Sequence, residues 1–439
     1  MYKISLKKVV FLFNILKKNS ASFMLFFIAV FLLASCKKEI HPLVKTVFLT
    51  PAANLIANFS DTIYISGSIS SDYAIQKAVI QLTDNNFTPI SPAVELTLQS
   101  TDPHSFETDY VLENDYANTG NYLLNITVLS ENEVSNFYQP IFIKEIPRTT
   151  KKILLVTGQI TNPQLSELNN LTLSYINSFS QTFLDLKIDS RYKLIYMCGK
   201  DKIEAISSSN YVDQFALSPL AINADSFTSV NQYKNLIRLC RNDGNILSYN
   251  QLGRLDNQTG ENLFFRPIFS YVNGNYLYAY ILKNGSPKIA VFFYPSGVAR
   301  QELLIDFEPL AFKAISETEV LIFGNKNGHV LVYKYLTLGN TVQLLKDIPS
   351  TKLNNAYSIN TSTTLLLTSN GIYKYDIPTN SVILVNTTDF SGVSFDEVND
   401  ILYCFSGTNI QLLQGTSFAI LNNITAADTV RSIGVLYSK

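Results

Sequence analysis

Tryptophan does not occur among the 439 residues, and histidine occurs at three scattered positions, His41, His104 and His329. A metal site built from histidine therefore has almost no support, because such sites need several ligands close together. Charged residues make up 16% of the chain, which is below the quarter or so that is usual in soluble domains. The formal net charge is −1 and no long basic run lies beyond the N-terminus, so a surface that follows nucleic-acid phosphates is not expected.

The sequence also lacks the short motifs that mark common active sites. It contains no G-x-G-x-x-G, P-loop, G-x-S-x-G or H-E-x-x-H pattern, so it predicts no catalytic residue, cofactor or metal site. Gly244 and Gly328 follow an Asp or Asn and stand just before predicted strands. Glycine in such a place predicts a turn with positive φ rather than a phosphate-binding loop.

Cysteine is scarce, with four in the chain. Cys198, Cys240 and Cys404 each fall in the second strand of a different predicted repeat, and no C-x-x-C or paired spacing links them. A disulfide would have to join separate repeats with Cα atoms within about 7 Å of each other. The three residues are therefore predicted to be small, buried core side chains.

Aromatic side chains are abundant, with 25 Tyr and 28 Phe, and hydrophobic residues make up 46% of the chain. This composition suits strands better than helices and provides a sizeable core. A chain of 439 residues is long enough for two or three domains. The composition predicts an all-β protein with more than one domain.

The N-terminal segment has the features of an export signal rather than of a folded domain. Five lysines come first, and an apolar run from Ala21 to Leu33 follows, which is too short for a spanning helix. The run ends in Leu33-Ala34-Ser35-Cys36, which resembles the bacterial lipobox. The resemblance implies a signal peptide over 1–35, diacylglycerol on the Cys36 thiol, and acylation (palmitate or a similar chain) of the new N-terminus.

Residues 36–42 would then form a lipidated tether. No Asp follows Cys36 directly, so retention in the inner membrane is not signalled and the outer membrane is the expected location. Whether the protein faces the periplasm or the cell surface stays open. The alternative is an uncleaved signal anchor in which the cysteine occurs by chance.

Residues 43–146 are predicted to form a β-sandwich. About seven short strands occur in about a hundred residues, with alternation in Ile63, Ile65, Gly67 and Ile69 and again from Tyr122 to Val128. Pro140 inside the last strand predicts an edge or a bulge. The expected strands are Thr46–Leu49, Thr62–Ile69, Ala78–Leu82, Val94–Leu98, Ser105–Leu112, Tyr122–Leu129 and Asn136–Lys144.

Two stretches of this domain, Gly67–Val79 and Gly120–Val128, resemble bacterial immunoglobulin-like domains. The resemblance implies a spacer that holds the next domain away from the membrane. Ser130 stands where many of those domains have an Asp, so no calcium site is carried over, and Asp72 is predicted to be a solvated turn residue. Pro147 to Thr150 form the predicted linker, 147–150.

Residues 151–439 are predicted to form a β-propeller of roughly seven blades. Strand pairs recur about every 40 residues, which is the blade length of known propellers, and each pair is followed by a turn and a third strand. The recurring anchor residues are Ile188, Val230, Val272, Ile315, Ile359 and Phe395.

The seventh blade would come from closing the ring. Ile433–Tyr437 reads as a first strand, Lys152–Thr157 as a second strand and Leu171–Ile176 as a third strand of one shared blade. A ring of six or eight blades is the alternative. The layout of the whole chain resembles Gram-negative propeller lipoproteins.

A ligand would be expected at the mouth of the central channel. The first-strand positions expected there are mixed and mostly neutral: Lys187, Ser229, Tyr271, Ala314, Ser358 and Ser394. The acids near two first strands, Asp185, Asp189 and Asp396-Glu397, are predicted to be solvated turn residues. Two segments, Gly158–Asn170 and Gly253–Asn262, are predicted to be long loops on one face, where binding tends to occur.

These patterns predict a membrane-anchored lipoprotein that acts as a binding or scaffold module of the cell envelope, with a protein partner or a glycan. The alternative is a propeller hydrolase or lyase that acts on polysaccharide, which would need convergent acids at the channel mouth. A purely structural surface protein is a third possibility. No nucleic-acid partner is expected.

The lipobox generates the first test. We expect Cys36→Ala to release the protein from membranes, because the substitution removes the thiol that would carry the lipid. Membrane fractionation followed by immunoblotting measures this, with Cys198→Ala as the matched control that leaves the anchor intact. Continued membrane anchoring of the Cys36→Ala protein would contradict lipidation at this residue.

Overall fold

The computed structural model describes residues 44–99, 103–131, 133–218, 226–259, 264–349 and 351–439. Every regular element in these ranges is a strand, and no helix in them is long and apolar enough to cross a membrane. The chain divides into two compact units, Met1–Ile146 and Pro147–Lys439. Cys36 and the predicted signal segment lie outside the described residues.

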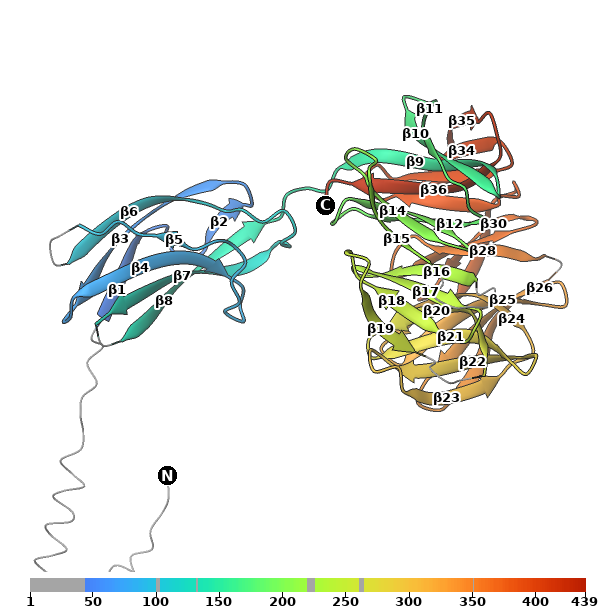
Figure 1. The fold of residues 1–439 in the computed structure, drawn as a ribbon, viewed down its shortest axis with the longest axis horizontal. Helices are drawn as coiled ribbons and strands as arrows, with labels where there is room; N and C mark the ends of the chain where they lie inside the picture. Colours follow the sequence, from blue (N-terminus) through green and yellow to red (C-terminus); the bar gives the residue numbers. More distant parts are fainter. Residues whose placement is uncertain (1–43, 100–102, 132, 219–225, 260–263, 350) are drawn as a thin grey trace, which may run out of the picture. The chain divides into compact units, whose positions relative to one another are not determined.

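The first unit consists of two sheets with the strand orders β1-β3-β6 and β2-β8-β7-β4-β5 (Figure 1). Buried side chains from both sheets form one hydrophobic cluster, so the sheets share a core. The strands are β1 (Val44–Thr50), β2 (Leu55–Asn58), β3 (Thr62–Ser71), β4 (Ile75–Thr83), β5 (Val94–Glu95), β6 (His104–Val111), β7 (Gly120–Ser130) and β8 (Val134–Lys144).

The predicted alternation in β3 and β7 is confirmed, because Ile63, Ile65, Gly67 and Ile69 are all buried, as are the alternate residues of β7 from Tyr122 to Val128. Gly67 is required by close packing. A Cβ atom there would lie 2.6 Å from the Cζ atom of Phe106 and 2.4 Å from the carbonyl oxygen of Val47.

The sequence missed β2, a four-residue strand that pairs in parallel with the end of β8. Four residues are too few to show alternation, so the pairing depends on β8 as a template. β2 covers β8 only from Ile141 onward. Pro140 therefore stands where β8 still forms the edge of the sheet, as its missing N–H predicted.

The second unit is a β-propeller of seven four-stranded antiparallel sheets. The seven sheets, which we call blades A to G in ring order, are blade A, β36-β9-β10-β11; blade B, β12–β15; blade C, β16–β19; blade D, β20–β23; blade E, β24–β27; blade F, β28–β31; and blade G, β32–β35. The bounds in blades A to C are β9 (Thr150–Gln159), β10 (Asn162–Asn169), β11 (Thr172–Ser178), β12 (Phe183–Asp189), β13 (Leu194–Gly199), β14 (Ile203–Ser207), β15 (Asp213–Leu217), β16 (Phe227–Tyr233), β17 (Leu236–Arg241), β18 (Ile246–Tyr249) and β19 (Leu255–Thr259).

The remaining strands supply blades D to G and close the ring. Their bounds are β20 (Arg266–Asn273), β21 (Tyr276–Lys283), β22 (Ser286–Phe293), β23 (Ala299–Leu304), β24 (Glu308–Ser316), β25 (Glu319–Lys326), β26 (His329–Leu336), β27 (Thr341–Ile348), β28 (Leu353–Ser358), β29 (Thr363–Thr368), β30 (Gly371–Asp376), β31 (Ser381–Asn386), β32 (Gly392–Asp396), β33 (Ile401–Ser406), β34 (Asn409–Gln414), β35 (Ile420–Thr425) and β36 (Val430–Tyr437).

Seven hydrophobic clusters join the blades in a closed ring. Each cluster takes its buried side chains from two consecutive blades, and one of them joins blade G to blade A. Second strands such as β13 and β29 are buried along their whole length, so both faces of a blade are covered. A blade on its own would leave both of these faces in water, which explains why the unit must repeat.

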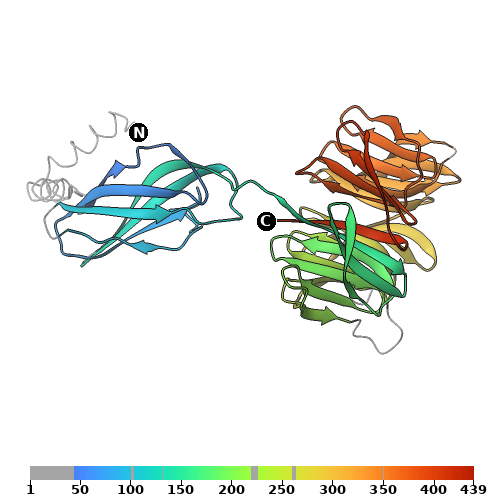
Figure 2. The same cartoon turned by 90° about the horizontal axis from the view of Figure 1, so that it is seen from above.

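Ring closure occurs as predicted, by pairing the last strand with the first. β36 pairs with β9 from Val430 to Tyr437, and in Figure 1 its red ribbon runs beside the green ribbon of β9. In Figure 2 the same red strand lies between the green and the orange blades, and the inner strands that it contacts are β12 and β32.

One part of the predicted closing blade was wrong. Leu171–Ile176 is not its third strand but belongs largely to β11, the fourth strand, and the third strand is β10. β10 contains Pro163 and mostly polar residues, which are poor strand formers. It is held by antiparallel partners on both sides, β9 and β11, and Leu165 in its middle is fully buried.

A left-handed residue recurs in the turn between the third and fourth strands of six blades. Its φ angle lies between 49° and 72° in every case, and in four of the six blades the register of the two strands shifts beside it. The residues are Tyr211, Gly253, Gly297, Asn340, Asn380 and Phe418. Gly244 and Gly328, in other turns, have φ values of 100° and 77°, so their prediction as turn glycines is confirmed.

Two of these turn residues also join neighbouring blades. The buried Tyr335 hydroxyl donates to Asn340 Oδ1 at 2.8 Å, and Asn340 Nδ2 donates to the carbonyl of Glu302 in the preceding blade at 3.1 Å. The same arrangement recurs with Tyr375 and Asn380, whose Nδ2 donates to the Leu345 carbonyl at 3.3 Å.

This arrangement predicts a ranked pair of substitutions. Asn340→Gly keeps the left-handed backbone and removes two hydrogen bonds, so we expect a loss of about 1–2 kcal/mol in the free energy of unfolding. Asn340→Ala should cost more, by about 1–2 kcal/mol, because Ala disfavours positive φ. Urea denaturation measures both.

Asn327→Ala is the matched control for the backbone cost. Asn327 is exposed, has a φ of 52°, and its side chain makes no hydrogen bond to another described residue. Asn327→Ala therefore measures the backbone cost alone. An Asn340→Gly protein as stable as the wild type would show that the side-chain hydrogen bonds of Asn340 contribute nothing to stability.

Candidate functional site

The inner strands of four consecutive blades line a cavity of about 540 Å³, which we call the inner-strand cavity. Blades F, G, A and B each contribute their first strand: β28, β32, β36 and β12. The lining comprises 184–188, 355–357, 391–394, Phe405 and 431–435. This is the part of a propeller where first strands approach the ring axis, so the ring itself positions these residues.

Two opposite charges at the cavity form an ion pair. Lys187 Nζ lies 2.6 Å from Asp185 Oδ2, and the two side chains keep 26% and 36% of their exposure. Burial acts to lower the pKa of Lys187, but the adjacent Asp185 carboxylate outweighs it, so the pKa of Lys187 is raised. The lysine is therefore charged at neutral pH, and Asp185 is the single carboxylate among the lining residues.

The remaining polar groups come from β28, β32 and β36. Burial raises the pKa of Tyr357, and its hydroxyl accepts a hydrogen bond from the Phe395 backbone N–H at 3.3 Å. Ser394 is buried on β32, while Asn355 on β28 is exposed. Arg431 is left out of the β36–β9 pairing by a bulge, and its Nε donates to the Gly158 carbonyl at 3.0 Å.

Two of the six predicted first-strand residues line this cavity, Lys187 and Ser394. Ser229, Tyr271, Ala314 and Ser358 are not among its lining residues. The sequence missed Asn355, Tyr357 and Arg431 because six of the seven inner strands carry a bulge near their start. A bulge adds one residue and shifts which side chains share a face.

The predicted anchor residues do not form one buried column. Val230 and Val272 are buried, but Ile315 is 40% exposed and is left out of the strand pairing by a second bulge in β24. Ile359 lies just beyond the end of β28. The predicted repeat length of about 40 residues agrees with the blades. The predicted anchor residues, however, do not occupy the same position in each blade.

The prediction of solvated turn acids was wrong for Asp189 and Asp396, which are 4% and 0% exposed. Asp189 Oδ1 accepts from the Tyr192 N–H at 3.0 Å, and Asp396 accepts from the Thr150 hydroxyl at 2.7 Å and from Asn399 Nδ2 at 2.7 Å. Each carboxylate accepts from a donor in the turn after its first strand, and Asp396 also accepts from Thr150 at the start of β9. Glu397 is half exposed and pairs with Arg148.

Both predicted long loops contain strands. Gly158–Asn170 includes β10, and Gly253–Asn262 includes β19, with residues from 260 lying outside the described ranges. Asn, Gln and Asp residues suggested loops, but pairing with neighbouring strands overrides that local preference. The described residues of these two segments do not form the extended binding loops that the sequence suggested.

The three cysteines of the propeller are free and buried, which confirms their assignment to the core. Burial raises the pKa of Cys404 to about 12 and also raises the pKa values of Cys198 and Cys240. These thiols are therefore protonated and unreactive at neutral pH. Within the described ranges, no three His, Cys, Asp or Glu side chains gather closely enough to hold a metal ion.

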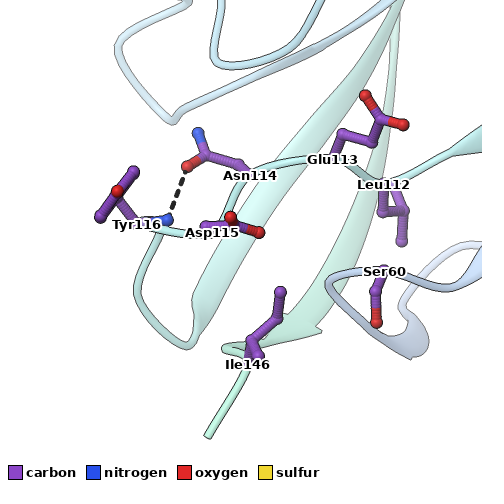
Figure 3. Close-up of a pocket in the computed structure, with 7 residues that line it drawn as sticks. All are labelled: Ser60, Leu112, Glu113, Asn114, Asp115, Tyr116 and Ile146. Carbon is purple, nitrogen blue, oxygen red and sulfur yellow. Dashed lines mark hydrogen bonds between the residues drawn. The ribbon is translucent and has the colours of Figure 1, made fainter. Parts of the chain in front are cut away.

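A second cavity, of about 530 Å³, lies on the first unit and is drawn in Figure 3. Asn114 Oδ1 accepts a hydrogen bond from the Tyr116 N–H at 3.0 Å in the segment after β6. The acids Glu113 and Asp115 beside it are exposed. Asp72, which the sequence placed in a solvated turn, is exposed and does not line this cavity.

No protein-family model matches the chain, and no curated protein matches it. A quinonprotein alcohol dehydrogenase-like protein from Bacteroides thetaiotaomicron is 11% identical, with 90% of this chain and 99% of that chain covered and a TM-score of 0.45. AztD from Citrobacter koseri is 10% identical over 66% of this chain and 98% of that one, with a TM-score of 0.45. BamB from Moraxella catarrhalis is 11% identical over 60% and 85%, with a TM-score of 0.40.

At this identity and TM-score, these chains say nothing about the ligand or the reaction of this one. The assignment of the propeller rests on the seven closed sheets described above.

The buried acid at the end of β12 generates a pH prediction. Burial raises the pKa of Asp189 in the folded protein above the value of about 3.9 in an unfolded chain. The folded state therefore holds this proton to higher pH, and the stabilisation is present at low pH and is lost as pH rises through the folded pKa.

We expect Asp189→Asn to raise the Tm at pH 7 relative to wild type, and the difference to shrink towards pH 4. The amide keeps an oxygen that can accept from the Tyr192 N–H and avoids the buried charge. Thermal unfolding across this pH range measures it, with the exposed Asp213→Asn as control. A deficit that grows from pH 4 to pH 7 would contradict the prediction.

Proposed function

We propose that the chain is a lipid-anchored binding protein of the outer membrane, attached through Cys36. The support is the signal pattern that ends in Leu33-Ala34-Ser35-Cys36. The first unit acts as an immunoglobulin-like spacer in this proposal, because two sheets around one core make a rigid body. The propeller is then the part that binds.

The observation that carries the binding role is the inner-strand cavity. Its volume of about 540 Å³ is in the range of small-molecule sites. Ser391, Ser394, Ser432 and Asn355 offer hydroxyl and amide groups, and the Lys187–Asp185 pair offers both a donor and an acceptor. A glycan presents many hydroxyl groups that both donate and accept, so one or two sugar units are the ligand that suits this lining best.

Aromatic side chains add to this match. Tyr357 and Phe405 line the same cavity, and aromatic rings provide apolar surface against which a sugar ring can pack. The alternative reading, a hydrolase or lyase, would use two carboxylates on either side of the scissile bond. Asp185 is the single carboxylate in the lining and is already paired with Lys187, which favours binding over hydrolysis.

The test is a glycan array probed with the intact protein and two variants. Asn355→Trp fills the cavity from an exposed position, and Asn409→Trp places the same side chain on an exposed site of β34 away from it. We expect Asn355→Trp to weaken glycan binding by at least about tenfold, which corresponds to about 1.4 kcal/mol, and Asn409→Trp to leave it unchanged.

Equal binding by the Asn355→Trp protein would show that the cavity is not the site. If no glycan binds, affinity purification from crosslinked outer membranes decides the partner class. If a protein is recovered in stoichiometric amounts, the ligand is a protein partner and not a glycan. That result would support a scaffold role for the chain.

A further inference from the structure

Arg238 is a buried cation that has no carboxylate partner among the described residues. It lies in the middle of β17 and is 1% exposed, and none of its three guanidinium nitrogens makes a well-formed hydrogen bond. An arginine stays charged inside proteins. An isolated buried charge is costly unless it is paired or hydrogen-bonded, so this residue calls for an explanation.

The side chain points into the interface between blades C and D. Its neighbours Ile237 and Leu239 join the cluster with blade B, whereas Cys240 joins the cluster with blade D. Side chains alternate along a strand, so Arg238 shares the face of Cys240. Ser248 is directly opposite Arg238 in the β17–β18 register and therefore lies on the same face.

Blade D presents a hydroxyl to this interface from the other side. Ser270 is opposite Ala279 in the β20–β21 register, and Ala279 belongs to the cluster between blades C and D. Asn231, which is opposite Arg238 on β16, donates to the Ser270 carbonyl at 3.0 Å. The hydroxyls of Ser248 and Ser270 are buried, at 0% and 2% exposure, and form no well-formed hydrogen bond within the described ranges, although Ser270 lies against the Cys240 thiol.

Two tyrosines lie against the guanidinium. The Arg238 Cζ atom is 5.5 Å from the ring centre of Tyr233 and 5.2 Å from that of Tyr294, and the two rings meet edge-on at 5.8 Å. Ring faces stabilise a cation electrostatically, but they do not accept the N–H groups in the plane of the guanidinium. The tyrosines account for part of the charge, and the Tyr294 hydroxyl accounts for one contact with the guanidinium, which leaves most of its N–H groups without an acceptor.

No carboxylate compensates Arg238. Burial lowers its pKa, and the groups that act against this are Tyr294, Cys240 and Tyr233. The neighbouring acid on the same hairpin, Asp243, is paired with Arg241 instead. Within the described ranges, the interface thus presents a cation and two hydroxyl donors, and no carboxylate acts on the cation.

We propose that Arg238, Ser248 and Ser270 form a binding site for a small monovalent anion of the chloride type, between blades C and D. Each of the three groups can donate to such an ion, and an anion would neutralise the guanidinium as well. Because these side chains are 0–2% exposed, a halide suits the site better than the larger phosphate or sugar. Tyr233 and Tyr294 are partly exposed and cover the guanidinium, so the ion would enter past them.

The consequence is that chloride holds two blades together. An ion that binds the folded chain and not the unfolded chain raises stability with the logarithm of its concentration once the site is filled. The experiment compares the Tm of the intact protein in sodium chloride and in sodium gluconate at equal ionic strength. Gluconate is too large for the site, so general salt effects cancel in the comparison.

We expect the wild-type Tm to rise with chloride and not with gluconate. Arg238→Met, which keeps an unbranched side chain without charge, should lose this dependence, and Ser248→Ala should shift it to higher chloride. Arg254→Met is the control, because Arg254 is exposed and lies in the turn just before β19. Its chloride dependence should equal that of the wild type.

Crystals of the wild-type protein grown in sodium bromide give a second measurement that does not depend on any variant folding. An anomalous peak beside Arg238 supports the proposal. Water alone at that position, bromide at exposed sites only, or the same chloride dependence in wild type and Arg238→Met would overturn it.

Discussion

The structure of the propeller depends on one constraint, which is that a blade buried on both faces cannot be the last in a row. Seven clusters between blades satisfy this constraint only because β36 pairs with β9 and joins the two ends of the chain in blade A. Without that pairing, blade G and the remainder of blade A would each expose an apolar face and a strand edge. Ring closure therefore fixes the positions of all seven inner strands.

Those fixed positions decide what the cavity contains. β12, β28, β32 and β36 come from distant parts of the sequence, yet consecutive blades bring them together. The bulges at the starts of β12, β28 and β36 then select which side chains line the space. Arg431 is such a case, since strict alternation from Ile433 would place it on a different face from the one that the bulge gives it.

The sequence was sufficient for the blade period, the closing of the ring and the burial of Cys198, Cys240 and Cys404, because all three follow from alternation and repeat length. It was insufficient for β10, β19 and β2, whose polar or short segments become strands through neighbours that are remote in sequence. It also misjudged Asp189 and Asp396. A turn acid reads as solvated unless one knows that an adjacent strand covers it.

The interface between blades C and D differs from apolar packing in one respect, because it contains a buried charged side chain. The forces that exclude water from the seven clusters also raise the cost of any charge placed among them. Arg238 lies at such a place, and its two tyrosine neighbours compensate only part of its charge. Packing alone would favour an apolar residue at this position. A retained guanidinium that is faced by two hydroxyls is therefore better explained by a bound anion than by packing, which would give this propeller a binding site away from its axis.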